Sequence, residues 1–168
     1  MTDSEIVLAF QRAIGTPVLS ALAVFSSRWL IYLSIPFAVA AYRIRAYRLV
    51  VIEAAWSVLV AFAVSSIISA LVDRVRPFLA VKGVVALVPP NIQHGSFPSS
   101  HTAIAVAIAF ACANGHPVLG GVLGTAAVCV AIGRIATGMH FPTDILGGVA
   151  VGMLAVLIVR AIRDGMGS

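Results

Sequence analysis

Long apolar segments separated by short polar stretches make up most of the chain. Five of these segments are nearly free of charged side chains: Trp29–Tyr42, Leu49–Val72, Ser99–Ala113, Val118–Thr137 and Ile145–Ile162. A helix of about 20 apolar residues crosses a bilayer, so the longer segments can span a membrane. Ser99–Ala113 would be on the order of 20 Å long, which places His101 somewhat below the membrane surface. The pattern predicts a bundle of membrane-spanning helices.

The first part of the chain is less regular. Thr2–Gly15 mixes apolar and charged residues and predicts an amphipathic helix, which lies in the membrane interface or enters it as a first span. Pro17–Phe25 is apolar, but polar residues follow it, and Arg28 is expected near a membrane surface because a charge at mid-bilayer is costly. Pro36 is expected to kink the Trp29–Tyr42 segment.

Composition supports a membrane protein. The chain has 168 residues, of which 61% are hydrophobic and 10% charged, and its mean hydropathy is +1.07. A soluble domain of this size exposes too much surface to hide so many apolar side chains. We therefore expect one integral membrane domain, residues 1–168, with an all-α fold of five to six transmembrane helices.

The basic residues indicate an orientation rather than a nucleic-acid site. The net charge is +5, but the basic residues do not gather on one polar face, so no nucleic-acid partner is expected. By the positive-inside rule, one end of the bundle should be cytoplasmic, the end that carries Arg43, Arg45, Arg48, Arg160 and Arg163. The other end carries Arg74, Arg76, Lys82 and Arg134.

Several polar residues receive plain interpretations. Glu53 is read as an interfacial or hydrogen-bonded carboxylate, with a proton relay as the alternative. Cys112 and Cys129 are read as small buried apolar residues. His94 and His116 are read as ordinary loop residues. Glycines should allow close packing of the last two helices: Gly120, Gly121, Gly124, Gly147, Gly148 and Gly152.

The stretch between the last two apolar segments carries candidate chemistry. Arg134 offers a rigid fork of donors suited to phosphate oxygens. His140 can act as a base or nucleophile, and Asp144 can hold its imidazole in one tautomer. Pro142 suits the first position of a helix, which puts Asp144 in the first turn. The alternative is a loop between buried helices with incidental polar residues.

Two further polar stretches come before this one. Residues 73–77 (Asp-Arg-Val-Arg-Pro) end one apolar segment, and residues 97–101 (Phe-Pro-Ser-Ser-His) begin the next. The topology places both at the same side of the membrane as His140. The connection between them, Asp73–Phe97, is long and polar, as functional loops often are.

Together the three stretches resemble the motifs of the type-2 phosphatidic acid phosphatase superfamily, the lipid phosphate phosphatases. The resemblance rests on Arg76-Pro77, on Pro98-Ser99-Ser100-His101, and on Arg134, His140 and Asp144 at the family's spacing. Three positions depart from the pattern: Ser69 stands where the family has lysine, Ser100 where it has glycine, and Gly133 where it has serine.

The resemblance implies a mechanism and a role for each residue. His140 would form a phosphohistidine, Asp144 would orient it, and His101 would protonate the leaving group and then activate water. The phosphate would be bound by Arg76, Arg134, Ser99 and Ser100. Because Ser69 lacks a charge, Arg74 or else Lys82 could supply the missing cation, or the site could work with two arginines.

The expected function is metal-independent hydrolysis of a membrane lipid phosphate or diphosphate, without a cofactor. The short chain and outward-facing site resemble bacterial undecaprenyl-diphosphate phosphatases of this superfamily, which implies a multi-pass protein of the cell (inner) membrane with an extracytoplasmic site. Phosphatidylglycerophosphate and phosphatidic acid remain alternative substrates. A vanadate-dependent haloperoxidase is disfavoured by the hydrophobic chain. A lipid-phosphate transporter or binding protein is the non-enzymatic alternative.

Overall fold

The computed structural model describes residues 1–90 and 95–166, and within these ranges it contains helices and no strand. The α-helices are α1 (Asp3–Ala13), α2 (Pro17–Arg28), α3 (Ser34–Arg43), α4 (Arg48–Val72), α5 (Pro77–Ala80), α6 (Ser100–Gly115), α7 (Pro117–Ala136) and α8 (Pro142–Met166). Short 3-10 helices, η1 (Leu30–Leu33) and η2 (Arg45–Tyr47), flank α3. The all-α prediction is confirmed for the described residues.

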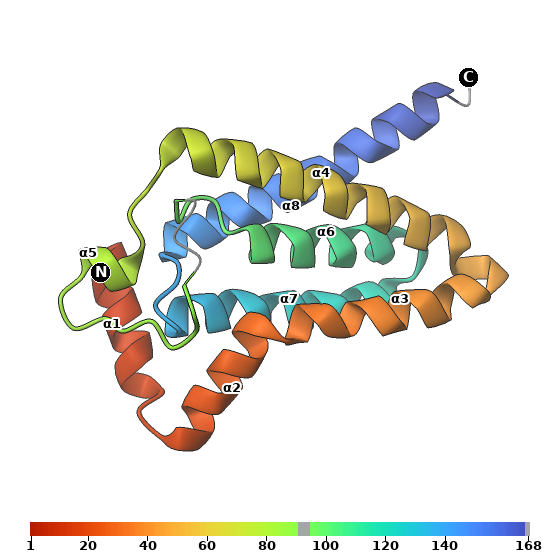
Figure 1. Ribbon diagram of the computed structural model, residues 1–168. Coiled ribbons are helices and arrows are strands. Elements are labelled where there is room, and N and C mark those ends of the chain that lie inside the picture. Colours follow the sequence, from red (N-terminus) through yellow and green to blue (C-terminus); the bar gives the residue numbers. More distant parts are fainter. Residues whose placement is uncertain (91–94, 167–168) are drawn as a thin grey trace.

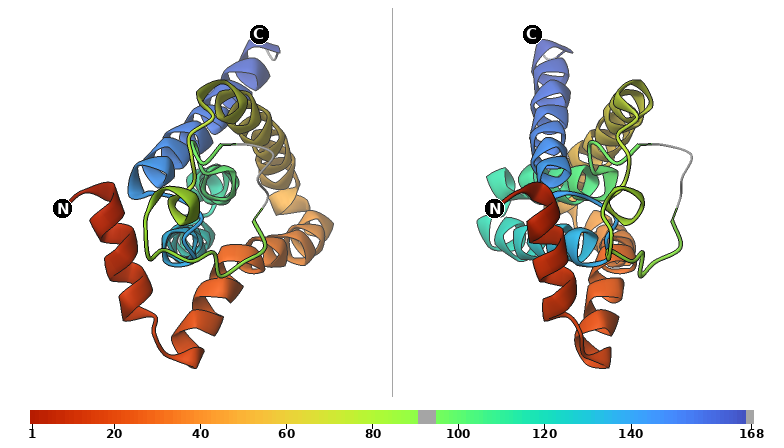
Figure 2. Two further views of the ribbon diagram at one scale, coloured as in Figure 1. Left: turned by 60° about the vertical axis from the view of Figure 1, so that its left-hand side comes forward. Right: turned by 90° about the vertical axis from the view of Figure 1, so that its left-hand side faces the viewer.

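The central element of the bundle is α6. It packs against α4, α7 and α8, which surround it (Figures 1 and 2). A helix enclosed on all sides is apolar all round and needs small side chains to admit its neighbours. Accordingly, five alanines along α6 are buried: Ala103, Ala105, Ala107, Ala109 and Ala111. The same close packing operates on α8, where a Cβ added to Gly148 would lie 2.6 Å from the Ser99 carbonyl oxygen.

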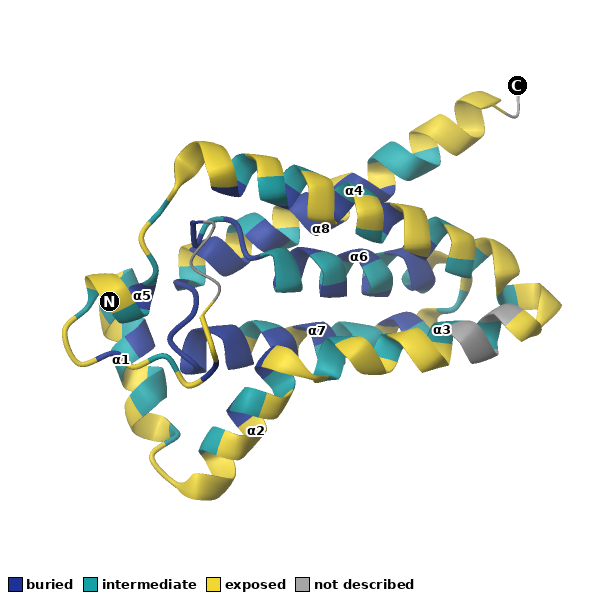
Figure 3. Ribbon diagram, viewed as in Figure 1, coloured by how far each residue is buried: buried dark blue, intermediate teal, exposed yellow. Residues whose placement is uncertain are grey.

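The outer faces of the bundle are exposed (Figure 3), and large apolar side chains lie on them. Large side chains such as Leu59, Phe62, Val122 and Leu157 are about half exposed or more. Apolar surface on this scale is suited to contact with lipid rather than water. The protein is therefore a helical membrane protein.

Fewer helices pass a test of length and composition for membrane spans than the five to six expected from the sequence. Three helices are long and apolar enough to cross a membrane, namely α4, α7 and α8, and the bent pair of α2 with the start of α3 makes a fourth if counted as one span. The apolar helix α6 has only 16 residues, and α1 has 11 residues, about 16 Å at 1.5 Å per residue. Five to six spans are thus not confirmed by length and composition.

The bend in the first hairpin lies upstream of the expected position. α2 and the following helical segment meet at 54° between Arg28 and Leu30, not at Pro36. Pro36 is the third residue of α3, where a backbone N–H has no intrahelical acceptor to lose. Arg28 is exposed at the bend, with its guanidinium 5.1 Å from the Trp29 ring centre.

The amphipathic helix α1 crosses one end of the bundle (Figure 1). Thr2 and Glu5 form a capping box at its start, and Val7 is fully buried among side chains of the loop before α6 and of α7 and α8. The apolar residues recur with helical periodicity on one face of α1, and this face packs against the rest of the protein.

The other end of the bundle is held by Glu53. Its carboxylate on α4 accepts from Arg160 at 2.7 Å and from Arg163 at 2.5 Å, both on α8. Arg160 also donates to the Phe110 carbonyl at the end of α6. The interpretation of Glu53 as a hydrogen-bonded carboxylate is confirmed. Cys112 is buried as expected, whereas Cys129 is exposed on the outer face of α7.

Candidate active site

The three polar stretches meet at the end of the bundle that α1 covers. Arg76 precedes α5, His101 begins α6, and Arg134 lies in the last turn of α7. His140 follows in the turn before α8, whose first turn carries Asp144, as Pro142 at its first position predicted. Burial lowers the pKa of His101, and the nearby Arg134, His140 and Arg76 lower it further, to about 3. The structure thus brings together the candidate catalytic and phosphate-binding residues.

The imidazole of His140 is held in one tautomer. Its Nε2 lies 3.1 Å from Arg134 Nη2, and its Nδ1 lies 2.7 Å from the Ser96 carbonyl oxygen. An arginine only donates and a carbonyl only accepts. The two contacts therefore assign the proton to Nδ1 and a lone pair to Nε2, which is the atom that faces Arg134.

The surroundings of His140 also keep it neutral. The side chain is only 2% exposed, and this burial lowers the pKa of His140 more than the neighbouring Asp144 raises it. Arg134 and Arg76 lower it further, because a second positive charge near an imidazolium is unfavourable. A neutral imidazole with a lone pair on Nε2 is the form that a nucleophile needs.

Asp144 is fully buried behind His140. Its Oδ2 accepts from the Phe141 amide at 2.8 Å and its Oδ1 accepts from Arg74 at 2.6 Å. The distance from Oδ2 to His140 Nδ1 is 3.8 Å, longer than a hydrogen bond. In this structure the Ser96 carbonyl, which sequence reasoning missed, is the direct acceptor for the Nδ1 proton.

Two arginines give the site a positive charge. Arg76 donates to the carbonyls of Met139 and Gly95, both at 3.3 Å, and burial lowers its pKa. Arg76 acts electrostatically on Arg134. Arg134 is only 6% exposed, and its buried Nε has no hydrogen-bond partner among the described residues. Buried N–H donors normally have a hydrogen-bond acceptor, so the unpartnered Nε of Arg134 suits the binding of an anion.

The start of α6 faces the same region. Ser99 is fully buried, donates its amide to the Asp144 carbonyl at 3.0 Å, and accepts from the Thr102 hydroxyl at 3.1 Å. Ser100 and His101 are half-buried and lie in the first turn, where backbone N–H groups lack intrahelical acceptors. Such a helix start favours a phosphate.

The departure at Gly133 has a structural reason. A Cβ there would lie 2.8 Å from the Ser27 backbone nitrogen on α2. Ser27 is buried, and its hydroxyl accepts from Arg134 Nη1 at 3.3 Å. Ser27 on α2 thus supplies a hydroxyl to Arg134, and glycine at 133 lets α2 approach α7 closely. No local pattern marked Ser27, because its role depends on a contact across more than 100 residues.

Of the three accessory candidates, Ser69 shares a partner with a phosphate-binding candidate, because Arg76 also donates to the Gly95 carbonyl. Ser69 is buried and donates to the Gly95 carbonyl at 2.9 Å. Arg74 binds Asp144, Thr143 and Asp3. Lys82 is exposed in the loop beside α1. His116 stacks on Tyr47 at the far end of the bundle, and His94 lies outside the described residues. Within residues 1–90 and 95–166, no three His, Cys, Asp or Glu side chains are grouped to hold a metal.

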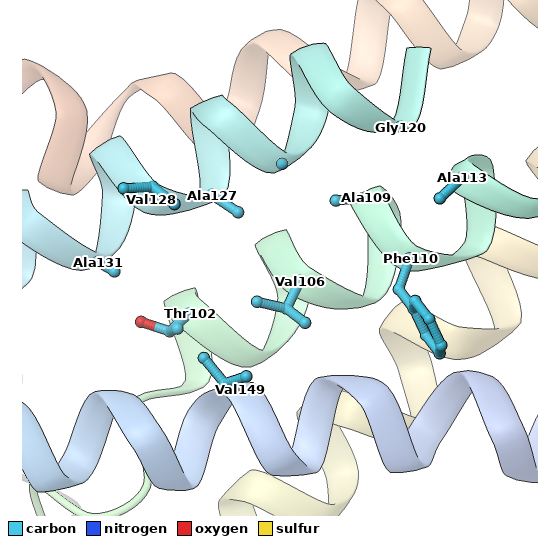
Figure 4. Close-up of a pocket in the computed structure, with 11 residues that line it drawn as sticks. Thr102, Val106, Ala109, Phe110, Ala113, Gly120, Ala127, Val128, Ala131 and Val149 are labelled. Atoms are coloured by element: carbon cyan, nitrogen blue, oxygen red, sulfur yellow. The ribbon is translucent and has the colours of Figure 1, made fainter. Parts of the chain in front are cut away.

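Apolar grooves run along the bundle, among them two of different size. The larger, about 760 Å³, lies between α3, α4, α6 and α7; it reaches Ser100 and His101 at one end and Arg43 and Tyr47 at the other. The smaller, about 360 Å³, lies between α6, α7 and α8, with side chains such as Val106 and Val149 on its walls (Figure 4). Thr102 is the polar residue that lines it. Only the larger groove is lined by one of the candidate catalytic residues.

Comparison with known proteins places these features in a family. The family model described as "PAP2 superfamily" matches residues 50–165. "Bacitracin transport permease protein BcrC" of Bacillus licheniformis is 34% identical over 112 residues, 67% of this chain and 55% of that protein. "Putative undecaprenyl-diphosphatase YbjG" of Escherichia coli is 33% identical over 123 residues, 73% of this chain and 61% of that protein. The chain therefore spans only about 60% of the length of these relatives.

The fold has a solved counterpart. The crystal structure of Aquifex aeolicus LpxE superposes with a TM-score of 0.78 over 94% of this chain and 93% of that chain, at 23% sequence identity. At this identity the likeness shows a shared fold.

Proposed function

The chain belongs to the PAP2 superfamily, and from that premise we propose that it hydrolyses the phosphate of a membrane lipid phosphate or diphosphate. The observation that carries the proposal is the meeting of the buried Arg134, the half-buried Arg76, the start of α6 and the Nε2 lone pair of His140 near one end of an apolar groove of about 760 Å³. The arginines and the start of α6 suit binding of a phosphate, and the lone pair suits attack on it.

The first chemical step forms a phosphoenzyme. Arg76, Arg134 and the amides at the start of α6 bind the phosphate oxygens, and Arg134 exchanges its contact with His140 Nε2 for one with the phosphate. The freed lone pair attacks phosphorus, and the bond from phosphorus to the leaving oxygen breaks with its electron pair on that oxygen. The negative charge of the bound phosphate and the charge developing on the leaving oxygen offset the lowered pKa of His101, which gives this oxygen a proton. The product is a phosphohistidine.

The second step returns the enzyme to its starting state. The now neutral His101 takes a proton from water as the water oxygen attacks phosphorus. The bond between phosphorus and Nε2 breaks and the electron pair returns to the imidazole. Inorganic phosphate leaves, and Asp144 and the Ser96 carbonyl stabilise the position of His140 throughout. The roles need cationic side chains rather than a metal, so activity should not depend on a divalent ion.

The substrate tail is assigned to the larger groove. This groove is apolar, runs from His101 to the opposite end of the bundle, and holds about 760 Å³. The groove of Figure 4 meets neither histidine and is only about half as large. A long apolar chain in the larger groove would place its phosphate beside His101 and His140.

Undecaprenyl diphosphate is the favoured substrate. The support is the similarity to the Escherichia coli relative named "Putative undecaprenyl-diphosphatase YbjG". Phosphatidylglycerophosphate and phosphatidic acid are the alternatives, since they present the same phosphate chemistry. We place the protein in the inner membrane with its active site on the extracytoplasmic side, because Arg43, Arg45 and Arg48 gather at the other end.

Transport of a lipid phosphate is the second candidate. The name of the Bacillus licheniformis relative refers to transport of bacitracin, a function that needs no bond cleavage. The site favours hydrolysis, because a binding protein has no need of a neutral histidine lone pair beside the bound phosphate.

The test is phosphate release by the purified protein in detergent. Undecaprenyl diphosphate, phosphatidylglycerophosphate and phosphatidic acid are compared for the wild type and His140→Ala, each with and without EDTA. We expect release by the wild type, fastest with undecaprenyl diphosphate and unchanged by EDTA, and none by the variant. Absence of release from every lipid would favour transport or binding, and loss on chelation with rescue by magnesium would contradict the metal-independent step.

A further inference from the structure

The contacts of Arg74 point away from phosphate binding. Its Nη1 donates to Asp144 Oδ1 and to the Thr143 hydroxyl, both at 2.6 Å, and its Nη2 lies 3.0 Å from Asp3 Oδ2. Its guanidinium also lies over the Phe141 ring, 4.3 Å from the ring centre. Both terminal nitrogens are therefore bound to side chains of the protein, which leaves Arg74 poorly placed to grip a substrate.

Arg74 instead fixes the carboxylate behind the nucleophile. With Oδ1 on Arg74 and Oδ2 on the Phe141 amide, the Asp144 carboxylate cannot rotate freely. It stays 3.8 Å from His140 Nδ1 and close to a compensating positive charge. A fully buried carboxylate without such a partner would be costly, so Arg74 also stabilises Asp144 in its charged form.

The backbone of Arg74 binds Ser96, the second residue that contacts His140 Nδ1. The Arg74 carbonyl accepts from the Ser96 amide at 2.7 Å, and the Ser96 carbonyl accepts the Nδ1 proton of His140. One residue thus holds both groups that face Nδ1, the carbonyl through its main chain and the carboxylate through its side chain.

Helix α1 completes this arrangement. Asp3, its first residue, binds Arg74 and also accepts from the Thr143 hydroxyl. Gln11 anchors the helix on the loop before α6: its side-chain amide donates to the Val85 carbonyl at 2.6 Å and accepts from the Val85 amide at 3.0 Å. The amphipathic N-terminal helix is therefore docked where it presents a carboxylate to Arg74.

We propose that Arg74, held by Asp3 of α1, is a positioning residue that sets the place and the charge of Asp144 behind the nucleophile His140. The proposal rests on the proposed function and assigns Arg74 a task different from phosphate binding. It also gives α1 a role in the site, because Asp3 holds Arg74 in place.

The charges around His140 define what each substitution should do. Asp144 faces it from α8, Arg134 from α7, His101 from α6 and Arg76 from the connection before α5. Arg74 stands behind Asp144, and Asp3 behind Arg74. Loss of the Arg74 charge leaves Asp144 less neutralised and raises the pKa of His140. Loss of the Asp3 charge leaves Arg74 to act more strongly on Asp144, so the pKa of His140 does not rise.

The first measurement is independent of turnover. Protein with ¹³C-labelled histidine is titrated by NMR in detergent, and the His140 signal is identified by its loss in His140→Asn. We expect a higher His140 pKa in Arg74→Gln, a value near that of the wild type in Arg74→Lys, and no increase in Asp3→Asn. A general loosening of the site would raise the pKa in Arg74→Gln and Asp3→Asn alike, and that result would overturn the proposal.

The second measurement separates positioning from phosphate binding. The substrate is a lipid phosphate that the wild type hydrolyses. Arg74→Gln should lower kcat at least tenfold with little change in KM, and Arg74→Lys should retain most of the wild-type kcat. Arg45→Gln, an exposed arginine at the opposite end, is the matched control. An increase in KM at unchanged kcat would assign Arg74 to the phosphate and overturn the proposal. If the wild type released no phosphate, the proposed function would fail, and the titration would still decide the role of Arg74.

Discussion

At the scale of single residues, the site depends on which donors and acceptors meet His140. The sequence identified Arg134, His140 and Asp144 from their spacing, and the structure brings them together. It did not identify Ser96 or Ser27, because a backbone carbonyl leaves no mark in a sequence and Ser27 reaches Arg134 from a distant helix. It also suggested phosphate binding for Arg74, since helical periodicity cannot foresee where the chain turns after the left-handed Asp73, whose φ is +43°.

The planar fork of Arg134 is expected to matter more than its charge. Arg134→Lys keeps a cation but loses the paired donors that contact Ser27, His140 and a bound phosphate. We expect a decrease in kcat/KM of at least tenfold, about 1.4 kcal/mol of transition-state stabilisation. The control is Arg163→Lys, because Arg163 lies more than half exposed on Glu53 at the other end of the bundle. Equal activity of the two variants would contradict the role of Arg134.

At the scale of elements, the long apolar helices were predictable and the first hairpin was not. The limits of α4, α6 and α7 agree with the apolar segments to within two residues, since Pro117 and the polar stretches mark the ends. The bend between α2 and η1 has no proline at its centre and reflects packing of α2 against α7. The prediction of five to six spans is not confirmed, because α6 has only 16 residues and falls short of a full span by length.

The packing of α2 on α7 can be tested at Gly133. Gly133→Ala places a methyl group against the Ser27 backbone, which cannot move aside without shifting α2. Overpacking of this kind costs about 1–3 kcal/mol, so the melting temperature in detergent should fall, and activity with it. Gly121→Ala on the same helix meets nothing within 4 Å and should be neutral. Similar melting temperatures for the two variants would contradict the close contact.

At the scale of the whole molecule, one end of the bundle carries the site and the other carries most of the basic anchors. Arg76, His101, Arg134 and His140 share the end under α1, as the topology read from the sequence required. Which end faces the cytoplasm follows from the arginines and awaits a direct test.

Cysteine labelling in whole cells tests the orientation. In a background that lacks Cys112 and Cys129, Ala80→Cys and Ala46→Cys place single thiols on exposed positions at opposite ends. We expect an impermeant maleimide to label the first from outside the cell and the second only after lysis. The reverse pattern would place the site on the cytoplasmic side.

The central claim is that His140 Nε2 attacks the phosphate and carries it as a phosphohistidine. The most direct test is to quench His101→Ala during incubation with ³²P-labelled undecaprenyl diphosphate, because loss of the second-step base should let the intermediate accumulate. We predict acid-labile label on the protein, mapped to the peptide that contains His140 and absent from the His101→Ala, His140→Ala double variant. Label that persists in the double variant, or phosphate release by His140→Ala at the wild-type rate, would contradict the account.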